Sequence, residues 1–266
     1  MRRVSLCVQG VICMVFLVAA QGCNTDLTGL GDGSQSDLDP SETSGGVSGG
    51  SGPHIESDGQ VVVEAEHFTD EGSDWTGAFG AMVELDSRNW ILQESAASGP
   101  APDPDGFHSG ASGDAYMECL PDTRVTHDDP MDPGSFYDDG TGGAWLSYDI
   151  DFQTTGMYYV WARAYSTGTE DNGLHVGVDG VLADAGRRMQ WCGANEWRWS
   201  SAQRDTGGTS CGVNGTITIQ IDRPGLHEIT FYQREDGFEF DRFLLTTNAA
   251  YTPQGAGPRE SDRTNP

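Results

Sequence analysis

The stretch AWLSYDIDFQ (residues 144–153) alternates apolar and polar side chains from Leu146 to its end. Its apolar members fall on one face of an extended strand: Leu146, Tyr148, Ile150 and Phe152. Successive side chains of a strand point to opposite faces, so this spacing predicts a strand with one face in a core and the other in water. The stretch GTITIQIDRPG (residues 215–225) repeats the pattern with three isoleucines and ends in a Pro-Gly turn.

Similar runs of five to nine residues, bounded by Gly, Asp and Pro, recur along the chain. They occupy residues 61–67, 90–94, 115–120, 157–165, 173–180 and 226–233. No window shows the apolar period of an amphipathic helix, and 266 residues suffice for one main domain. We therefore predict an all-β domain at residues 60–248, an antiparallel β-sandwich of jelly-roll type with its loops gathered at the ends.

The first 22 residues are typical of an export signal, with two arginines before an apolar run too short to span a bilayer comfortably. The following AAQGC resembles the lipobox of bacterial lipoproteins, in which the cysteine, here Cys23, is acylated after cleavage. Gln21 departs from that motif, which usually has a small residue there. We expect an exported protein, lipid-anchored to the outer membrane or cell surface through Cys23. Ordinary cleavage near an unmodified Cys23 is the alternative.

Two segments have the composition of disordered chain. Residues 23–59 are mostly Ser, Gly, Asp and Thr, which cannot bury enough apolar surface to offset the entropy lost on ordering. We interpret them as a flexible tether. Residues 249–266 are similarly poor in apolar side chains, and we predict a disordered tail there.

The net charge of the chain restricts the classes of partner that it can bind. There are 41 acidic residues against 14 basic ones, giving a net charge of −27. Nucleic-acid binding requires clustered cations that neutralise phosphates, so this composition excludes it. We expect a monomer that touches a membrane only through its lipid anchor.

Three cysteines remain in the predicted domain, where export permits disulfides. Cys192 and Cys211 flank a segment rich in Gly and Trp, and we prefer them as the bridge, with Cys119 buried and reduced. The other pairings stay open, because a sequence does not fix connectivity.

Acidic residues interrupt the apolar pattern at both ends of the domain, in VVVEAEHF (residues 61–68) and REDGFEFDRFLLT (residues 234–246). Glu64 and Glu66 are two apart, so a strand would place them on one face about 7 Å from each other. If the first and last strands are neighbours, Asp241 joins them. Three converging carboxylates repel unless a cation neutralises them, and Ca²⁺ binds carboxylate oxygens. We predict a structural calcium ion at these three acids, with acids facing water as the alternative.

The sequence resembles known carbohydrate-binding domains. EAEHF (residues 64–68) and FEFDRFLL (residues 238–245) are similar to the first and last strands of family 6 and family 35 carbohydrate-binding modules. GMYYVWARAYSTGTEDNGLHVGVDG (residues 156–180) resembles a segment of the C-terminal domain of glycoside hydrolase family 115. The resemblance covers most of residues 61–247. It implies a galactose-binding-like sandwich, calcium at the glutamate pair and the late aspartate, and carbohydrate binding.

A sugar site needs a flat aromatic ring surrounded by polar groups, because sugars offer apolar ring faces and hydroxyls. Three loops supply both: ANEWRWSS (residues 194–201), YSTGTEDNG (residues 165–173) and REDG (residues 234–237). The candidate carbohydrate-binding residues are Trp197, Trp199, Tyr165, Asp171, Asn172, Arg234, Glu235, Asp236 and Glu239. Glu239 stands where the resembled modules commonly have a sugar-bonding Asn, so a carboxylate there favours neutral hydroxyls or an amine. As alternatives, one of the two tryptophans covers the core, and Arg163 or Arg234 pairs with surplus acids instead of sugars.

Two other acidic loops are weaker candidates for metal binding. THDDP places His127 beside two aspartates, a pattern typical of a solvated loop. PDPDG places Asp103 and Asp105 two apart, like part of a calcium loop, but the glutamate expected at the twelfth position is absent.

Gly-x-Ser-x-Gly occurs at residues 46–50 and 208–212, but a nucleophile elbow lies between a strand and a helix and no helix is predicted, so we predict no such elbow. The sequence contains no His-Glu-x-x-His and no phosphate loop. Pairs of acids arise by chance in so acidic a chain, so they do not indicate glycoside hydrolysis. We expect a non-catalytic module that binds a polysaccharide or oligosaccharide. The alternatives are a small polysaccharide hydrolase or lyase that uses loop carboxylates, and a protein-binding adhesion module.

Overall fold

The computed structural model describes four stretches of the chain: residues 52–73, 88–94, 103–193 and 195–265. The predicted signal peptide, the lipid attachment at Cys23 and the tether up to residue 51 lie outside them and stay predictions. Within the described stretches, no helix has the length and apolar character needed to cross a bilayer.

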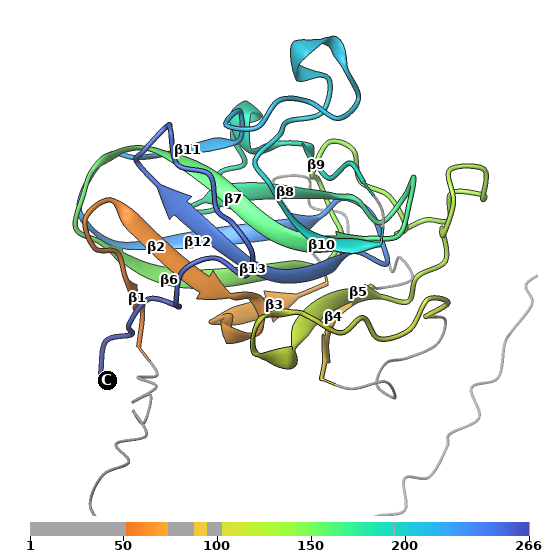
Figure 1. Cartoon of the computed structure of the whole chain (residues 1–266), viewed down its shortest axis with the longest axis horizontal. Helices are drawn as coiled ribbons and strands as arrows, with labels where there is room; N and C mark the ends of the chain where they lie inside the picture. The colour runs from red at the N-terminus through yellow and green to blue at the C-terminus, as the bar shows by residue number, and fades with distance from the viewer. Residues whose placement is uncertain (1–51, 74–87, 95–102, 194, 266) are drawn as a thin grey trace, which may run out of the picture. The chain divides into compact units, whose positions relative to one another are not determined.

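The described chain forms two sheets that face each other (Figure 1). The first runs β1 (His54–Ile55), β6 (Trp145–Phe152), β12 (Gly225–Gln233), β8 (Gly173–Val178) and β9 (Met189–Gln190), with β3 (Asp70–Gly72) paired to β6. The second runs β10 (Glu196–Ser200), β7 (Gly156–Ser166), β13 (Glu239–Thr246), β5 (Tyr116–Leu120) and β4 (Asn89–Gln93), with β11 (Thr218–Ile221) on β7 and β2 (Gln60–Glu64) on β13. Every pair is antiparallel except β1 with β6. The predicted antiparallel jelly-roll sandwich is confirmed.

The core lies between the sheets and follows the spacing of two read from the sequence. The alternate apolar residues of β6 are fully buried: Leu146, Tyr148, Ile150 and Phe152. Phe231 of β12 packs against Phe240 and Phe243 of β13, with ring centroids 4.9 and 4.8 Å away, and these contacts join the two sheets. Each such buried side chain contributes about 1.5–3 kcal/mol of transfer free energy.

The first long strand and the last one are neighbours, as expected, because β2 pairs with β13 and Glu64 lies opposite Arg242 (Figure 1). The predicted strand at residues 61–67 is too long, however. It ends at Glu64, and a 3₁₀ turn, η1 (Ala65–His67), follows. The hydroxyl of buried Tyr148 donates to the Ala65 carbonyl at 2.8 Å and fixes this turn, so Glu66 does not share a strand face with Glu64.

The folded unit is wider than predicted at both ends. Residues 249–265 were expected to be disordered, yet they run along β2: the Ser261 amide donates to the Val62 carbonyl at 2.9 Å. On the other side, β1 lies within the predicted tether, and the buried Glu56 accepts the Gln153 amide at 2.7 Å. The composition did not predict that these two segments are ordered, because they are held by backbone and polar hydrogen bonds rather than by a core of their own.

The disulfide joins Cys192 to Cys211, the pairing preferred from the sequence, with the two Cα atoms 5.5 Å apart. Cys119 of β5 is buried and unpaired, as also expected.

Candidate functional site

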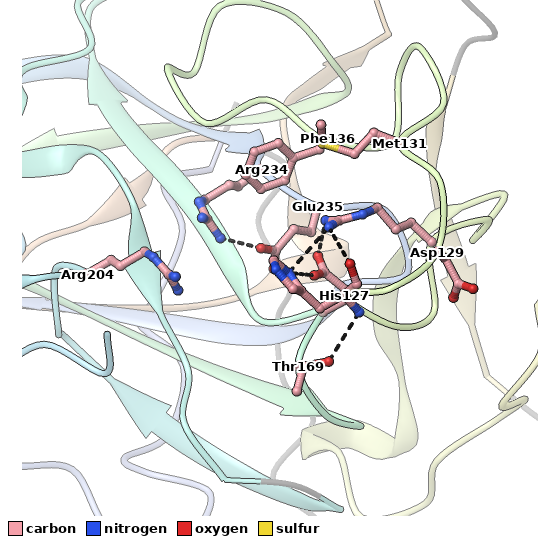
Figure 2. Close-up of a pocket in the computed structure, with 10 residues that line it drawn as sticks. His127, Asp129, Met131, Phe136, Thr169, Arg204, Arg234 and Glu235 are labelled. Atoms are coloured by element: carbon pink, nitrogen blue, oxygen red, sulfur yellow. Dashed lines mark hydrogen bonds and ion pairs between the residues drawn. The ribbon is translucent and has the colours of Figure 1, made fainter. Parts of the chain in front are cut away.

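Two of the three predicted ligand loops meet in a pocket of about 400 Å³ (Figure 2). The loop after β7 contributes Thr169 and Glu170, and the loop before β13 contributes Arg234 and Glu235. These loops lie at one end of the sandwich, because β7 and β13 are antiparallel neighbours there. The remaining lining residues were not predicted as ligand contacts: Arg124, His127, Asp129, Met131, Phe136 and Arg204.

Phe136 provides an aromatic wall of this pocket. A β-bridge pairs it with Glu235, and the Tyr137 amide donates to the Arg234 carbonyl at 2.8 Å. The ring is half-buried, and the guanidinium carbons of Arg124 and Arg234 lie 5.4 and 4.9 Å from its centroid. Cations at such distances are attracted by the ring face, so the two arginines and the ring position one another.

The two buried carboxylates of the pocket are held by cations. Glu170 pairs with Arg124 and accepts from His127 Nδ1 at 3.0 Å. Glu235 pairs with Arg234 and accepts the Asn172 amide at 2.8 Å. Burial raises the pKa of Glu235, while the charge of Arg234 opposes the rise. The pocket therefore presents an aromatic edge beside fixed charged groups.

Three predicted ligand residues support this end of the sandwich and do not line the pocket. Asp171, Asn172 and Asp236 are all buried. The Thr167 hydroxyl donates to Asp171 at 2.9 Å, and the Thr123 amide donates to Asp236 at 2.9 Å. Their side chains form hydrogen bonds with other residues of the loops.

Trp199 is a packing residue, which was one of the two alternatives for the tryptophans. It packs beside Trp161 and Tyr251, and its indole nitrogen donates to the Gly255 carbonyl at 3.0 Å. The C-terminal segment that carries Tyr251 and Gly255 was expected to be disordered, so the sequence could not show that it covers this ring.

The other predicted ligand residues, Trp197, Tyr165 and Glu239, lie together on the second sheet, away from the pocket lining. The Tyr165 ring centroid is 5.4 Å from Trp197 and 3.9 Å from His108. His108 Nδ1 lies 2.6 Å from Glu239 Oε1. His108 occupies a face where no sugar can stack on Tyr165 without displacing it.

The profile of the glycosyl hydrolase family 115 C-terminal domain matches residues 109–260, more than half of the chain. The chain belongs to this family. An uncharacterized protein of Formosa agariphila, P23, is 44% identical over 207 residues, which are 76% of this chain and 47% of the relative. The chain thus spans about half the length of that relative.

Solved structures of carbohydrate-binding modules are similar at a low level. A family 35 module from Clostridium thermocellum has a TM-score of 0.38 and 12% identity, covering 70% of this chain and 96% of the module. A family 35 module from Paenibacillus barcinonensis has a TM-score of 0.36 and 14% identity, covering 71% and 99%. Scores below 0.5 support no inference about function, and the fold above rests on the strands themselves.

The acids predicted to bind calcium in this family 115 C-terminal domain lie close enough to affect one another. Burial raises the pKa of Glu66 to about 8, and the charges of Glu64 and Asp241 add to the rise. Burial likewise raises the pKa of Glu64 to about 6. One oxygen each of Glu64 and Glu66 is buried without a hydrogen-bond partner. The two glutamate oxygens therefore suit a cation, although the three acids are not among the described groups whose potential ligand atoms all lie within 4.8 Å of one another.

Arginines pair with two of these acids, a role that the sequence left open for Arg163. Arg242 pairs with Glu64 at 3.0 Å, and Arg163 pairs with Asp241 at 2.5 Å. The Ser112 amide also donates to Asp241 at 2.7 Å, so both oxygens of Asp241 have partners. Two guanidinium groups thus supply part of the positive charge that we assigned to calcium.

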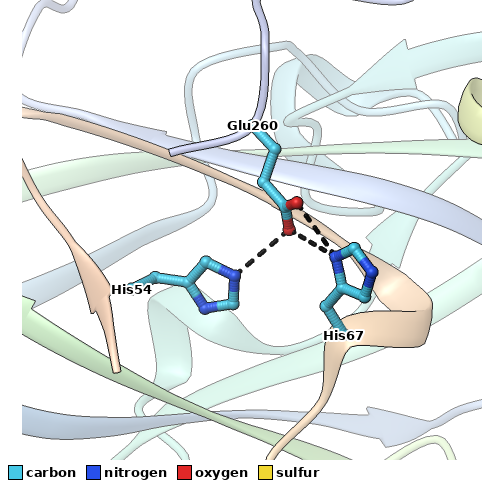
Figure 3. A group of neighbouring side chains, drawn as sticks. All are labelled: His54, His67 and Glu260. Carbon is cyan, nitrogen blue, oxygen red and sulfur yellow. Dashed lines mark hydrogen bonds and ion pairs between the residues drawn. The ribbon is translucent and has the colours of Figure 1, made fainter. Parts of the chain in front are cut away.

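Glu260, His54 and His67 form a further polar group, which joins the C-terminal segment to β2 (Figure 3). Glu260 lies between two histidines, 3.1 Å from His54 Nε2 and 2.8 Å from His67 Nδ1, and it accepts the Glu64 amide at 3.1 Å. We interpret this group as a structural clasp, because one carboxylate joins the start of the fold, the turn after β2 and the tail.

Proposed function

We propose that this domain is a non-catalytic carbohydrate-binding module, and that a polysaccharide or oligosaccharide binds in the pocket beside Phe136. The observation that carries the proposal is a half-buried aromatic ring set among fixed donors and acceptors in a pocket of about 400 Å³. That volume falls within the range typical of small-ligand sites, about 300–1,000 Å³. A sugar would place apolar C–H groups against the edge of this ring and hydroxyls against the polar groups.

The ion pairs of the pocket support binding in particular. Arg124 is held by Glu170, and Arg234 is held by Glu235 and by Asp138 at 3.0 Å. Side chains that are already fixed lose little conformational entropy when a ligand binds, so the pocket is organised before the sugar arrives.

The same contacts disfavour the catalytic alternative. Glycoside hydrolysis needs one carboxyl group that donates a proton and another that acts as a base or nucleophile. Both oxygens of Glu170 and both oxygens of Glu235 already accept from basic groups or a backbone amide. Neither carboxylate is therefore available for that chemistry without breaking an ion pair.

Calorimetric titration of the purified protein with a panel of plant and algal glycans tests the proposal, and a reducing-end assay on the same samples tests catalysis. We expect at least one glycan to bind without turnover. Phe136→Ala should weaken that binding about tenfold, because it removes an aromatic contact of a kind worth about 0.5–1.5 kcal/mol beyond buried area and releases Arg124 and Arg234. Leu226→Ala, at an exposed position of β12, is the control and should not change affinity. Release of reducing ends would favour the hydrolase or lyase, and binding that survives Phe136→Ala would move the site elsewhere.

We further propose that a structural calcium ion binds at Glu64, Glu66 and Asp241. Its support is the pair of unpartnered buried carboxylate oxygens and the raised pKa values at this site. The remaining ligands would be backbone carbonyls and water, because Ca²⁺ takes six to eight oxygens.

For the intact protein we propose export, acylation at Cys23 and anchoring to the outer membrane or cell surface as a monomer. This proposal is supported by the sequence alone. Mass spectrometry of the mature N-terminus tests it, with a diacylated or triacylated Cys23 as the expected product.

A further inference from the structure

Four side chains form a row across the outer face of the second sheet. Strand register places Trp197 beside Tyr165, Tyr165 beside Glu239 and Glu239 beside Glu118. Their strand neighbours Phe240 and Met117 point into the core, so the row lies on the opposite face. Two glutamates are thus directly opposite each other on adjacent strands, an arrangement that is destabilising when both are charged.

The segment at residues 103–108 covers the acidic end of this row. Potential ligand atoms of Asp103, Asp105 and Glu118 all lie within 4.8 Å of one another, and the same holds for Asp105, His108 and Glu239. Asp105 belongs to both sets, so four carboxylates and one imidazole converge. The Tyr116 hydroxyl accepts the His108 amide at 3.0 Å, which fixes the segment in place.

Both glutamates of the row are almost wholly inaccessible, at 0% exposure for Glu118 and 1% for Glu239. Oε1 of Glu118 and Oε2 of Glu239 have no hydrogen-bond partner. The side-chain amide of Gln93 donates to the other oxygen of Glu118 at 2.7 Å, and Nδ1 of His108 contacts the other oxygen of Glu239. Among the described residues, no arginine forms an ion pair with any of the four acids.

Burying uncompensated carboxylates costs several kcal/mol each, so a folded protein neutralises them by a proton or by a cation. Two unpartnered oxygens that face further acids and a histidine are the arrangement of a cation site.

We propose that Asp103, Asp105, His108, Glu118 and Glu239 form a binding site for a divalent transition-metal ion such as Zn²⁺ or Mn²⁺. The imidazole donor favours Zn²⁺ or Mn²⁺ over Ca²⁺ and Mg²⁺. Ca²⁺ and Mg²⁺ take oxygen ligands, whereas Zn²⁺ and Mn²⁺ accept mixed nitrogen and carboxylate donors. The site is separate from the pocket beside Phe136 and from the calcium site at Glu64, and it does not depend on carbohydrate binding.

The metal would also have a local structural effect. It would link β5, β13 and the segment at residues 103–108 through side chains that otherwise repel one another. His108 would bind through its ring while it stacks on Tyr165. The aromatic row next to the metal, Tyr165 and Trp197, would then be held rigid.

The test is calorimetry of the protein with Zn²⁺ and Mn²⁺ after chelation and dialysis, repeated with 1 mM Ca²⁺ present so that the calcium site is filled. We expect one equivalent of Zn²⁺ or Mn²⁺ to bind in both conditions. Glu239→Gln and His108→Ala should each weaken that binding at least tenfold, and Asp184→Asn, a fully exposed acid, is the control. Glu66→Gln should leave it unchanged, since that residue belongs to the calcium site.

Thermal unfolding separates lost binding from lost folding. Without metal, Glu239→Gln should unfold at the same temperature as the wild type or higher, because it removes one of two opposed acids. With Zn²⁺ or Mn²⁺ added, only the wild type should gain stability. The proposal is overturned if no transition metal binds, if Ca²⁺ competes for the same equivalent, or if Glu239→Gln and His108→Ala bind metal as the wild type does.

Discussion

The second sheet carries two groups of buried acids that differ in what neutralises them. At the end of β2, Glu64 and Asp241 pair with Arg242 and Arg163. Across β5 and β13, Glu118 and Glu239 meet Gln93, His108 and two further aspartates. Both groups have the same sequence signal, an acid inside an apolar strand. The difference teaches that this signal reports a buried charge, while long-range neighbours decide whether an arginine, a proton or a metal compensates it.

The largest expected effect comes from removing an arginine at the first group. Arg163→Ala leaves Asp241 buried at 0% exposure without its ion-pair partner. Breaking a buried pair in this way typically costs about 3–5 kcal/mol. Chemical denaturation should show that loss in the free energy of unfolding. Arg259→Ala, at an exposed ion pair, is the control and should change stability by less than about 1 kcal/mol. A small effect of Arg163→Ala would mean that a cation already neutralises Asp241.

The second prediction concerns the pH dependence of stability. It should reveal the group of acids across β5 and β13, which has no arginine partner among the described residues. In the metal-free protein the folded-state pKa of Glu239 is about 10, above that of an unfolded glutamate. The folded state then holds a proton that the unfolded state releases, so stability is fully present below about pH 4 and falls as pH rises toward 10. The slope is at most about 1.4 kcal/mol per pH unit for one group.

Denaturation of the chelated protein at pH 5, 7 and 9 measures this slope. Glu239→Gln should reduce the slope by one group's share, because burial also raises the pKa of Glu118 to about 10, and Asp184→Asn should not change it. Saturating Zn²⁺ should flatten the wild-type curve as well, because metal replaces the proton. Equal slopes for the wild type and Glu239→Gln would show that Glu239 is not the titrating group.

The smallest effect is expected from removing calcium at the first group, because arginines already share in its neutralisation. Chelation should lower the stability of the wild type by about 1–3 kcal/mol, the range expected when a ligand present well above its dissociation constant is lost. Glu66→Gln should show little further response to chelation. If chelation leaves both proteins unchanged, the two arginines suffice and the calcium proposal fails.

Much of the fold could be predicted because it depends on local periodicity. The alternation in β6 and the long apolar run of β13 are visible within single strands. The neighbouring positions of β2 and β13 could be expected because the first and last strands of such sandwiches often lie side by side. The disulfide between Cys192 and Cys211 could be preferred for a similar reason, because both cysteines flank one short segment rich in Gly and Trp.

The site could be predicted only in part, because its members come from distant segments. Arg234 and Glu235 were expected at the ligand pocket, but Phe136 reaches them through a backbone bridge that no local pattern shows. Glu118 interrupts an apolar strand just as Glu239 does, so the same signal could have found it. The role of Trp199 depended on a tail whose polar composition hid its order.

The two ends of the folded unit leave it side by side. The Gly52 amide donates to the Thr264 carbonyl at 3.1 Å, and the Thr264 amide donates to the Pro53 carbonyl at 2.9 Å. These ends adjoin β1, which pairs with the last residues of β6, whereas the loop that carries Phe136 precedes the first residues of β6. A domain built this way can be spliced into a surface loop of another protein, or carried at its end, with its pocket directed away from the junction.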